Sequence, residues 1–211
     1  MSVLQDISAA LQRGRMPKVK ELVTQALEQG ESPKAILEDG LLAGMSVIGE
    51  KFKNNEVFVP EVLVAARAMN AGTALLKAKL QEEGVAAKGK AVIGTVKGDL
   101  HDIGKNLVKL MLEGKGLEVI DLGVDVSPEK FVEAVNEQGA QLVCCSALLT
   151  TTMGEMKHVV EALEKAGVRD KVKVMVGGAP ITQSFCDAIG ADAYTPDAAS
   201  AADKALEFVT A

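Results

Sequence analysis

Short apolar runs alternate with helical segments along the C-terminal part of the chain, and this alternation constrains the fold more than any other feature. Five runs have the length and composition of buried strands: KAVIGTV, LEVIDLG, AQLVCCS, VKVMVGG and ADAYT. The helical segments are expected near 103–115, 128–138, 153–166, 181–189 and 198–209. Strands that alternate with helices form an open parallel sheet covered on both faces. The sequence therefore predicts an α/β domain with the flavodoxin-like strand order 2-1-3-4-5.

The first part of the chain shows only helical periodicity. A Ser32-Pro33 pair is a typical helix start, and apolar residues then recur in steps of three or four, at Leu37, Leu41, Met45, Ile48 and Phe52. Another helix is expected from Pro60, and two shorter ones before Gly30. These segments predict a four-helix bundle over residues 1–85. The polar stretch QEEGVAAKG marks the boundary with a sheet domain over residues 86–211.

Net charge, cysteine content and hydropathy argue against several classes of protein. The net charge of −6 argues against a general nucleic-acid binder and against docking to anionic membranes. Three cysteines form neither a disulfide framework nor a CxxC metal pattern, so they are expected to be buried free thiols in a reducing cytoplasm. The N-terminus MSVLQDIS predicts no signal peptide, and no apolar run is long enough for a membrane span. We therefore expect a cytoplasmic globular protein.

Ligands of such sheets bind beyond the carboxyl ends of the strands, near the point where the strand order reverses. The first strand is followed by GDLHD at 98–102, the third by SALLTTT at 146–152 and the fourth by GGAP at 177–180. The last two stretches combine small residues, hydroxyls and bare backbone, so they can line a narrow slot. The first carries the one imidazole of this edge, His101.

A neutral imidazole is a good ligand for a transition metal, but one histidine cannot hold a bare ion tightly. No second histidine or cysteine is suitably spaced, so a metal bound by His101 would arrive in its own macrocycle and need only an axial ligand. Haem usually requires more aromatic residues than the 3% present here. Asp99 is placed to accept the second ring N–H of His101, and Thr150 or Thr152 could extend that chain of hydrogen bonds.

These residues resemble a known pattern. Asp99-x-His101-x-x-Gly104, Ser146-x-Leu148 and Gly177-Gly178, each after its own predicted strand, are similar to the cobalamin-binding module of B12-dependent proteins. GDLHDIGKN looks very like the module of methionine synthase and of the corrinoid proteins of methyltransferase systems. Upstream, GMSVIGEKFKNNEVFVPEVLVAARAM is similar to the helical cap of the methyl-carrying relatives, so the resemblance spans nearly the whole chain.

The resemblance implies roles for individual residues. His101 would replace the cofactor's own benzimidazole beneath cobalt, Asp99 would orient it, and Thr152, where methionine synthase has serine, would be the third member of a proton relay. Met45, Phe52 and Val59 would shield the upper face of the corrin. Contacts to the corrin or to its nucleotide tail would come from Gly98, Asp99, Leu100, His101, Asp102, Gly104, Ser146, Leu148, Thr150, Gly177 and Gly178.

The implied function is that of a corrinoid methyl carrier whose cobalamin cycles between methylcobalamin and cob(I)alamin. Such a chain is a cofactor-carrying subunit rather than a complete enzyme. Its partners would be a substrate-specific methyltransferase, a second methyltransferase serving an acceptor such as tetrahydrofolate or coenzyme M, and a corrinoid-reactivating protein. The methyl donor is left open among methylamines, methanol, methoxylated aromatics and glycine betaine.

Other interpretations remain at this point. The chain could be the binding module of an adenosylcobalamin mutase, a B12-responsive regulator, or a receiver-like phosphorelay domain with Asp99 as phosphoacceptor. Individual residues also have plain structural interpretations. Asp99 and Asp102 could cap the helix that begins near Ile103, and Thr152 with Glu155 forms a capping box. Met45 and Phe52 could be bundle core alone, and His158 is expected to be solvated on a helix.

Overall fold

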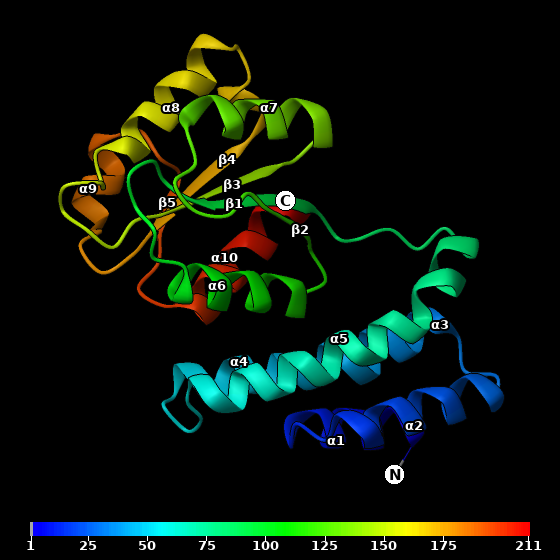
Figure 1. Ribbon diagram of the computed structural model, residues 1–211. Helices are drawn as coiled ribbons and strands as arrows, with labels where there is room; N and C mark the ends of the chain where they lie inside the picture. The colour runs from blue at the N-terminus through cyan, green and yellow to red at the C-terminus, as the bar shows by residue number, and fades with distance from the viewer. Residues whose placement is uncertain (1) are drawn as a thin grey trace. The chain divides into compact units, whose positions relative to one another are not determined.

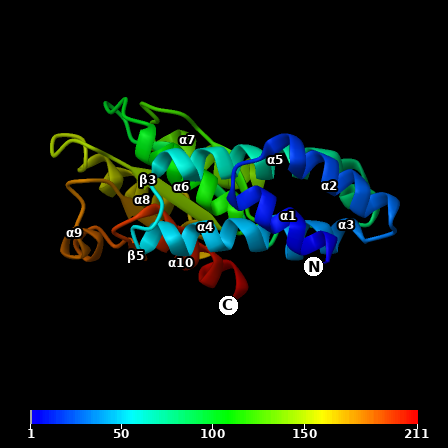
Figure 2. The ribbon, with the colours of Figure 1, turned by 90° about the horizontal axis from the view of Figure 1, so that it is seen from below.

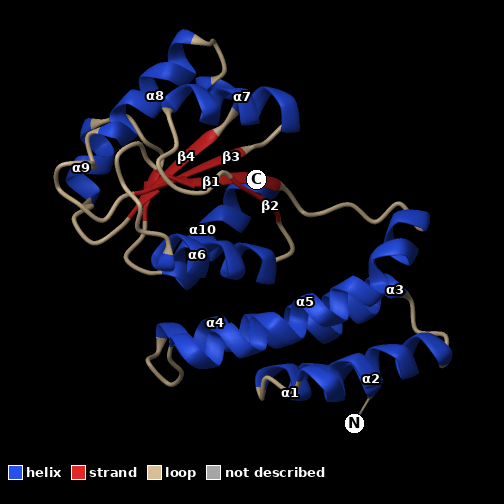
Figure 3. Cartoon of the chain, in the orientation of Figure 1, coloured by secondary structure: helices blue, strands red, loops and turns tan. Residues whose placement is uncertain are grey.

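The computed structural model describes residues 2–211 and divides the chain into two compact units (Figure 1). One comprises the described residues up to Ala87 together with Gly114–Gly116, and it is helical. The other comprises Lys88–Glu113 and Leu117–Ala211, and it contains a sheet between helices (Figure 3). The expected fold class, a helical domain followed by a flavodoxin-like α/β domain, is confirmed.

The helical unit contains four helical segments that lie side by side (Figures 1 and 2). Ser32 begins the third segment as expected, because its hydroxyl accepts the N–H of Ala35 at 3.1 Å. Close helix contacts depend on small residues: a Cβ on Gly72 would lie 2.9 Å from Leu41. The elements are α1 (Val3–Gln12), α2 (Met16–Glu28), α3 (Pro33–Ala35) continuing through η1 (Ile36–Leu42) into α4 (Ala43–Lys53), and α5 (Val59–Glu82).

The third segment departs from the regular helix that its spacing predicts. Residues Ile36–Leu42 form a π-helix, in which hydrogen bonds span five residues instead of four. The wider turn brings Ile36 and Leu41 into the core, while Leu37 is only half-buried. Met45 and Ile48 are buried as expected. The predicted helix face is therefore correct at Leu41, Met45 and Ile48, but Leu37 at its start is less buried than expected.

The second unit contains a five-stranded parallel sheet in the order β2-β1-β3-β4-β5, as predicted. Strand order reverses beside β1, which pairs with β2 on one side and β3 on the other. The strands are β1 (Lys90–Thr95), β2 (Glu118–Asp121), β3 (Leu142–Ser146), β4 (Lys173–Gly177) and β5 (Ala193–Tyr194). The helices are α6 (Ile103–Gly114), α7 (Pro128–Gln138), α8 (Glu155–Lys165), α9 (Gln183–Ala188) and α10 (Ala198–Thr210), with a short 3-10 turn at Arg169–Lys171.

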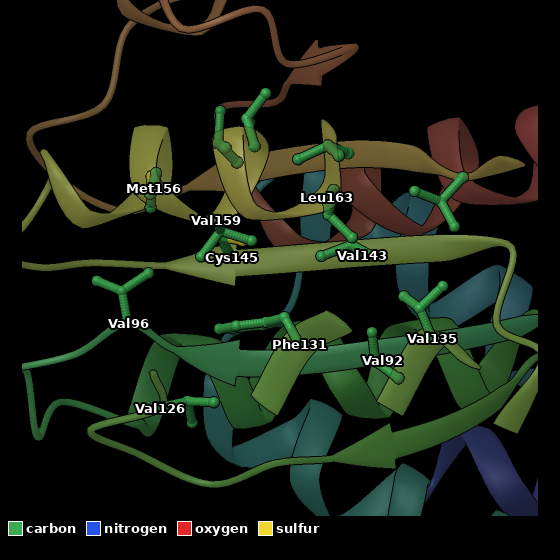
Figure 4. Close-up of a cluster of buried hydrophobic side chains, with 14 of the residues drawn as sticks. Val92, Val96, Val126, Phe131, Val135, Val143, Cys145, Met156, Val159 and Leu163 are labelled. Carbon is green, nitrogen blue, oxygen red and sulfur yellow. The ribbon is translucent and has the colours of Figure 1, made fainter. Parts of the chain in front are cut away.

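Helices cover both faces of the sheet, with α7 and α8 on one face and α6 and α10 on the other (Figure 1). Side chains alternate between the two faces along a strand, so Val92 points into the cluster under α7 and α8 (Figure 4). Phe131 belongs to this cluster and is fully buried. A Cβ on Gly94 would stand 2.9 Å from its ring, so the missing side chain makes room for Phe131. By the same alternation, Thr95 faces the side on which α6 begins.

The cysteines are buried free thiols, as expected: Cys144, Cys145 and Cys186. Burial raises the pKa of the Cys144 and Cys145 thiols far above the usual value, which keeps them protonated and unsuited to metal binding. Within residues 2–211, no helix combines the length and the apolar character that a bilayer crossing requires.

Candidate functional site

Three loops that follow strands β1, β2 and β3 meet at the carboxyl edge of the sheet. The first loop carries Asp99 and His101 and begins at Gly98, whose φ of 79° is a backbone conformation that glycine adopts readily. The third carries Leu148 and Thr152. The register that pairs Thr95 with Ser146 brings the first and third loops out side by side. Residues about fifty positions apart in the chain therefore come into hydrogen-bond contact.

Asp99 is fully buried and joins these two loops. Its Oδ1 atom accepts the backbone N–H of His101 at 3.1 Å and lies 2.7 Å from Nδ1 of the same residue. Its Oδ2 atom accepts the Thr152 hydroxyl at 2.7 Å and the Leu148 N–H at 2.8 Å. The Leu149 N–H approaches the same oxygen at 3.4 Å. The carboxylate thus accepts hydrogen bonds on both oxygens, which compensates for its removal from water.

These hydrogen bonds determine the charge of Asp99. Burial alone would raise the pKa of its carboxyl group. The hydrogen bonds from the Leu148 N–H, the Thr152 hydroxyl and His101 together lower that pKa well below its usual value. Asp99 is therefore an anion at neutral pH and can only accept hydrogen bonds. A neutral His101 must then carry its proton on Nδ1.

His101 consequently presents the lone pair of Nε2. The side chain is 50% exposed, and Nε2 has no hydrogen-bond partner among residues 2–211. A carboxylate that fixes one ring nitrogen and leaves the other as a free acceptor is the usual environment of a metal-binding histidine. The described residues contain no group of three or more histidine, cysteine or acidic side chains that could hold a metal ion. A single imidazole of this kind suits a metal that brings its remaining ligands with it.

The edge around His101 is apolar as well as exposed. Ile103 and Leu100 are 80% and 70% exposed, and they stand two positions after and one position before the histidine in the sequence. Leu148 and Leu149 in the third loop and Val124 in the second loop are exposed too. Large apolar side chains that gather around one exposed functional group indicate a binding surface. This donor set, one imidazole among apolar side chains, fits a macrocycle-bound metal such as the cobalt of cobalamin.

The expected capping box at Thr152 is wrong. Helix α8 begins after Gly154, and no side chain caps it. The Thr152 hydroxyl instead donates to Asp99, and Glu155 is bonded through its own N–H to the Thr152 carbonyl oxygen at 3.0 Å. Nor do the aspartates cap α6 through their side chains: Asp99 is engaged as described, and Asp102 accepts the side-chain amide of Asn106 at 3.0 Å. The Thr152 hydroxyl bonds to Asp99 because an ionised carboxylate forms stronger hydrogen bonds than a neutral acceptor does.

The segments predicted to form the slot lie at the carboxyl ends of β3 and β4, and the slot itself stays a prediction. Ser146 ends β3 half-buried, and Gly177 ends β4, its carbonyl accepting the Ala147 N–H at 3.2 Å. Gly178 has φ 135°, and a Cβ there would stand 1.8 Å from the Ala147 carbonyl oxygen, so only glycine fits. The remaining candidates of this unit, Gly98, Leu100, Asp102, Gly104 and Thr150, are all exposed.

The other candidates belong to the helical unit. Met45 is buried in α4, whereas Phe52 in α4 and Val59 at the start of α5 are half-buried. Their contact with a corrin stays a prediction. His158 is exposed on α8, 3.2 Å from Glu155, as expected for a solvated residue.

Sequence reasoning missed two residues that hold the site and a buried charge next to it in the chain. Thr95 and Asp125 form hydrogen bonds with the loop that carries His101. Lys105 is buried in the first turn of α6, the helix that follows this loop. A threonine in the apolar run KAVIGTV was a possible signal. Nothing in LGVDV singled out Asp125, because its role depends on a loop that is adjacent only in space.

Lys105 forms a buried ion pair. Its side chain is 2% exposed, and Nζ lies 2.6 Å from Oδ1 of Asp121, at the end of β2. The same oxygen accepts the Gly123 N–H at 3.0 Å, while Lys109 approaches Oδ2 at 3.3 Å. Burial would raise the pKa of Asp121, but the hydrogen bonds from Lys105 and Gly123 and the charges of both lysines lower it overall.

Asp121→Asn is expected to lower the free energy of unfolding at pH 7 by about 2 kcal/mol, since it leaves the Lys105 ammonium buried without its counter-charge. Because the folded-state pKa of Asp121 is lowered, its ionised form stabilises the fold above the ordinary pKa of about 3.9, and this contribution is lost as the pH falls below it. The difference between variant and wild type should narrow below about pH 4. Urea unfolding followed by circular dichroism at several pH values measures it. Asp170→Asn, at an exposed position, is the control, and a difference independent of pH would contradict the prediction.

Known protein families and curated relatives match this chain over nearly its whole length. The model of a B12 binding domain family matches residues 89–205, and a second B12 binding domain model matches residues 3–77. The dimethylamine corrinoid protein of Methanosarcina barkeri is 45% identical over 98% of this chain and 97% of its own length. The trimethylamine corrinoid protein of the same organism is 46% identical over 88% of this chain and 86% of its own.

Solved structures of cobalamin proteins share the fold of this chain. The methanol:cobalamin methyltransferase complex of Methanosarcina barkeri contains a similar chain, with a TM-score of 0.89 and 31% identity, covering 99% of this chain and 80% of that one. A cobalamin-binding protein from Desulfitobacterium hafniense has a TM-score of 0.81 and 30% identity, covering 97% of this chain and 98% of its own. The fold and the site thus define a B12-binding protein. The chain belongs to the corrinoid proteins of B12-dependent methyltransferase systems, and its cofactor is cobalamin.

Proposed function

We propose that this protein is a methyl carrier in which His101 is the lower axial ligand of cobalt, in place of the cofactor's own benzimidazole. The observation that carries the proposal is the hydrogen bond from Nδ1 of His101 to the buried carboxylate of Asp99, which leaves Nε2 as a free, exposed acceptor. When bound, cobalamin supplies a cobalt centre that can accept a methyl group from one protein and release it to another.

The side chains of the site select one tautomer of the neutral imidazole. Asp99 stays ionised and holds the proton of His101 on Nδ1, so that Nε2 keeps its lone pair for a metal. The Thr152 hydroxyl donates to the second oxygen of Asp99 and so completes a chain of three hydrogen-bonded groups, the proposed proton relay of the site.

The proposal also assigns roles to the sheet edge, to the slot segments and to the helical unit. The exposed apolar residues of the sheet edge contact the corrin, and the segments at Ser146–Leu148 and Gly177–Gly178 line the slot for its displaced nucleotide tail. The helical unit acts as a cap through Met45, Phe52 and Val59, excluding water and oxygen until a partner protein binds.

The proposed partners are a substrate-specific methyltransferase that donates the methyl group, a second methyltransferase that removes it to an acceptor such as tetrahydrofolate or coenzyme M, and a corrinoid-reactivating protein. Relatives named for dimethylamine and trimethylamine are 44–46% identical to this chain, and a structural relative is part of a methanol:cobalamin methyltransferase complex. Methylamine methyltransferases are therefore the first donors to test, followed by methanol methyltransferases.

Two alternative functions are disfavoured by particular observations. A mutase module usually lacks the helical cap, whereas this chain has a complete helical unit that matches a B12 binding domain model. A receiver-like domain needs an accessible phosphoacceptor, whereas Asp99 is fully buried and both of its oxygens accept hydrogen bonds.

Transfer of a radiolabelled methyl group tests the carrier function. The cobalamin-loaded, reduced protein is mixed with a dimethylamine, trimethylamine or methanol methyltransferase and its labelled substrate under anaerobic conditions. We expect the label to move to the corrinoid protein with at least one donor system, and to leave it when a second methyltransferase and its acceptor are added. A loaded protein that no donor system of the panel labels would contradict the proposal, provided that each methyltransferase labels its own corrinoid partner.

A further inference from the structure

Two residues outside the proposed relay hold the loop that carries His101. Thr95, the last residue of β1, is fully buried, and its hydroxyl donates to the carbonyl oxygen of His101 at 2.8 Å. Asp125, in the loop after β2, accepts the Gly98 N–H at 2.7 Å through Oδ1 and donates its own N–H to the Asp99 carbonyl oxygen at 3.0 Å. The backbone of the loop is thus held at three residues: Gly98, Asp99 and His101.

Asp125 makes both contacts from an unusual backbone conformation. Its φ is 54°, and among residues 2–211 only Asn55 is another non-glycine residue with positive φ. Aspartate tolerates this left-handed region better than most residues, yet the conformation still costs energy and persists only where surrounding contacts impose it. The left-handed turn allows the N–H and the carboxylate of one residue to face the same short stretch of the neighbouring loop.

We propose that Thr95 and Asp125 are positioning residues for His101, which hold its loop so that Asp99 meets Nδ1 and Nε2 is presented at the sheet edge. Thr95 fixes the carbonyl side of the histidine. Asp125 fixes the Gly98 N–H and the Asp99 carbonyl, the backbone groups on either side of the Gly98–Asp99 peptide. The use of the presented Nε2 rests on the proposed function, but the positioning itself is a property of the protein without cofactor and can be measured there.

The first test uses a matched pair at Thr95. Thr95→Val keeps the shape and removes the hydroxyl, whereas Thr95→Ser keeps the hydroxyl and loses a methyl group. Nitrogen-15 NMR of the cofactor-free protein at about pH 8, where histidine is neutral, reports the ratio of the two ring tautomers. We expect Thr95→Val to lower the Nδ1–H to Nε2–H ratio of His101 by about fivefold, the effect of one hydrogen bond, and Thr95→Ser to remain near wild type. His158, exposed on α8, is the reference imidazole in the same spectra and should not change.

The second test uses a matched pair at Asp125. Asp125→Gly removes the accepting carboxylate while relieving the left-handed backbone, so the fold should be retained; Asp125→Asn keeps an accepting oxygen and tolerates the same φ. We expect the glycine variant to shift the His101 tautomer ratio severalfold and the asparagine variant to resemble wild type. Asn55→Gly relieves the same backbone conformation in the helical unit, and it should leave the His101 signals unchanged. A merely structural role would affect thermal unfolding without moving the ring signals.

Addition of hydroxocobalamin separates this inference from the proposed function. In the wild type we expect imidazole coordination in the absorption spectrum, with about a fivefold lower coordinated fraction in Thr95→Val and in Asp125→Gly. Ring signals of His101 that are unchanged in both variants would overturn the positioning roles. If the variants shift the tautomer ratio but the wild type shows no imidazole coordination, the axial-ligand proposal fails while the positioning roles stand.

Discussion

Alanine in place of His101 is expected to abolish coordination of cobalt by protein nitrogen. Its ring presents a free Nε2 at the sheet edge, and residues 2–211 contain no group of three or more ligating side chains that could substitute. Cobalamin should still bind, because the apolar loops and the proposed slot would still contribute to its affinity, but the affinity should fall by about 10- to 100-fold, at least as much as losing an outer-shell partner costs. Methyl transfer by the loaded variant should fall with it.

Electron paramagnetic resonance of the reduced, cobalt(II) form identifies the lower ligand directly. In protein labelled with nitrogen-15 histidine, the splitting by the axial nitrogen should change from three lines to two, because that nitrogen would come from the protein. His101→Ala should lose the histidine signature, while His158→Ala, at an exposed position on α8, should keep it. A splitting that does not respond to labelled histidine would mean that the cofactor's own base stays beneath the metal, and the axial role of His101 would be wrong.

Gly178→Ala is expected to be the most disruptive substitution of the slot. A Cβ at this position would stand 1.8 Å from the Ala147 carbonyl oxygen, and φ of 135° is strained for any residue with a side chain. The backbone of one loop must therefore move away from the other. The strain and the displaced contact together should lower the free energy of unfolding by about 3 kcal/mol or more. For a domain of this size the melting temperature should fall by about 10 °C.

Gly177→Ala provides the matched control at the adjacent position. A Cβ there would meet nothing within 4 Å, so the cofactor-free variant should unfold near the wild-type temperature. If the slot binds the nucleotide tail, Gly177→Ala should nevertheless weaken hydroxocobalamin binding, because the new methyl group projects into open space that the tail would occupy. Thermal unfolding and a binding titration on both variants separate the two effects. Equal melting temperatures for the two variants would contradict the role of Gly178 in joining the loops.

The sequence predicted the fold well because the fold follows from periodicities. Runs such as KAVIGTV and VKVMVGG became central strands β1 and β4, and the alternation with helices fixed the parallel order. The π-helix at Ile36–Leu42 was not predicted, because one short stretch with hydrogen bonds over five residues leaves no distinct mark in an apolar spacing of three and four.

The sequence predicted part of the candidate site and missed the residues that hold its loop. Asp99, His101 and Thr152 come together in a hydrogen-bonded chain, although their roles toward the cofactor stay predictions. Thr152 was misinterpreted as a helix cap, because sequence spacing cannot show that a buried anion from another loop competes for its hydroxyl. Thr95 and Asp125 were missed because their partners in the histidine loop are not recognisable from local spacing.

By itself, the sequence determined the helical unit, the sheet, the edge at which a ligand is expected and the imidazole that lies there, since these depend on local periodicity and on the general geometry of parallel sheets. Only the tertiary structure decided which groups surround that imidazole. It brought Thr152 to Asp99, Asp125 to Gly98, and the Ala147 carbonyl against Gly178. Hydrogen bonds and close contacts act over a few ångströms between residues far apart in the chain, and such neighbours exist only once the chain has folded.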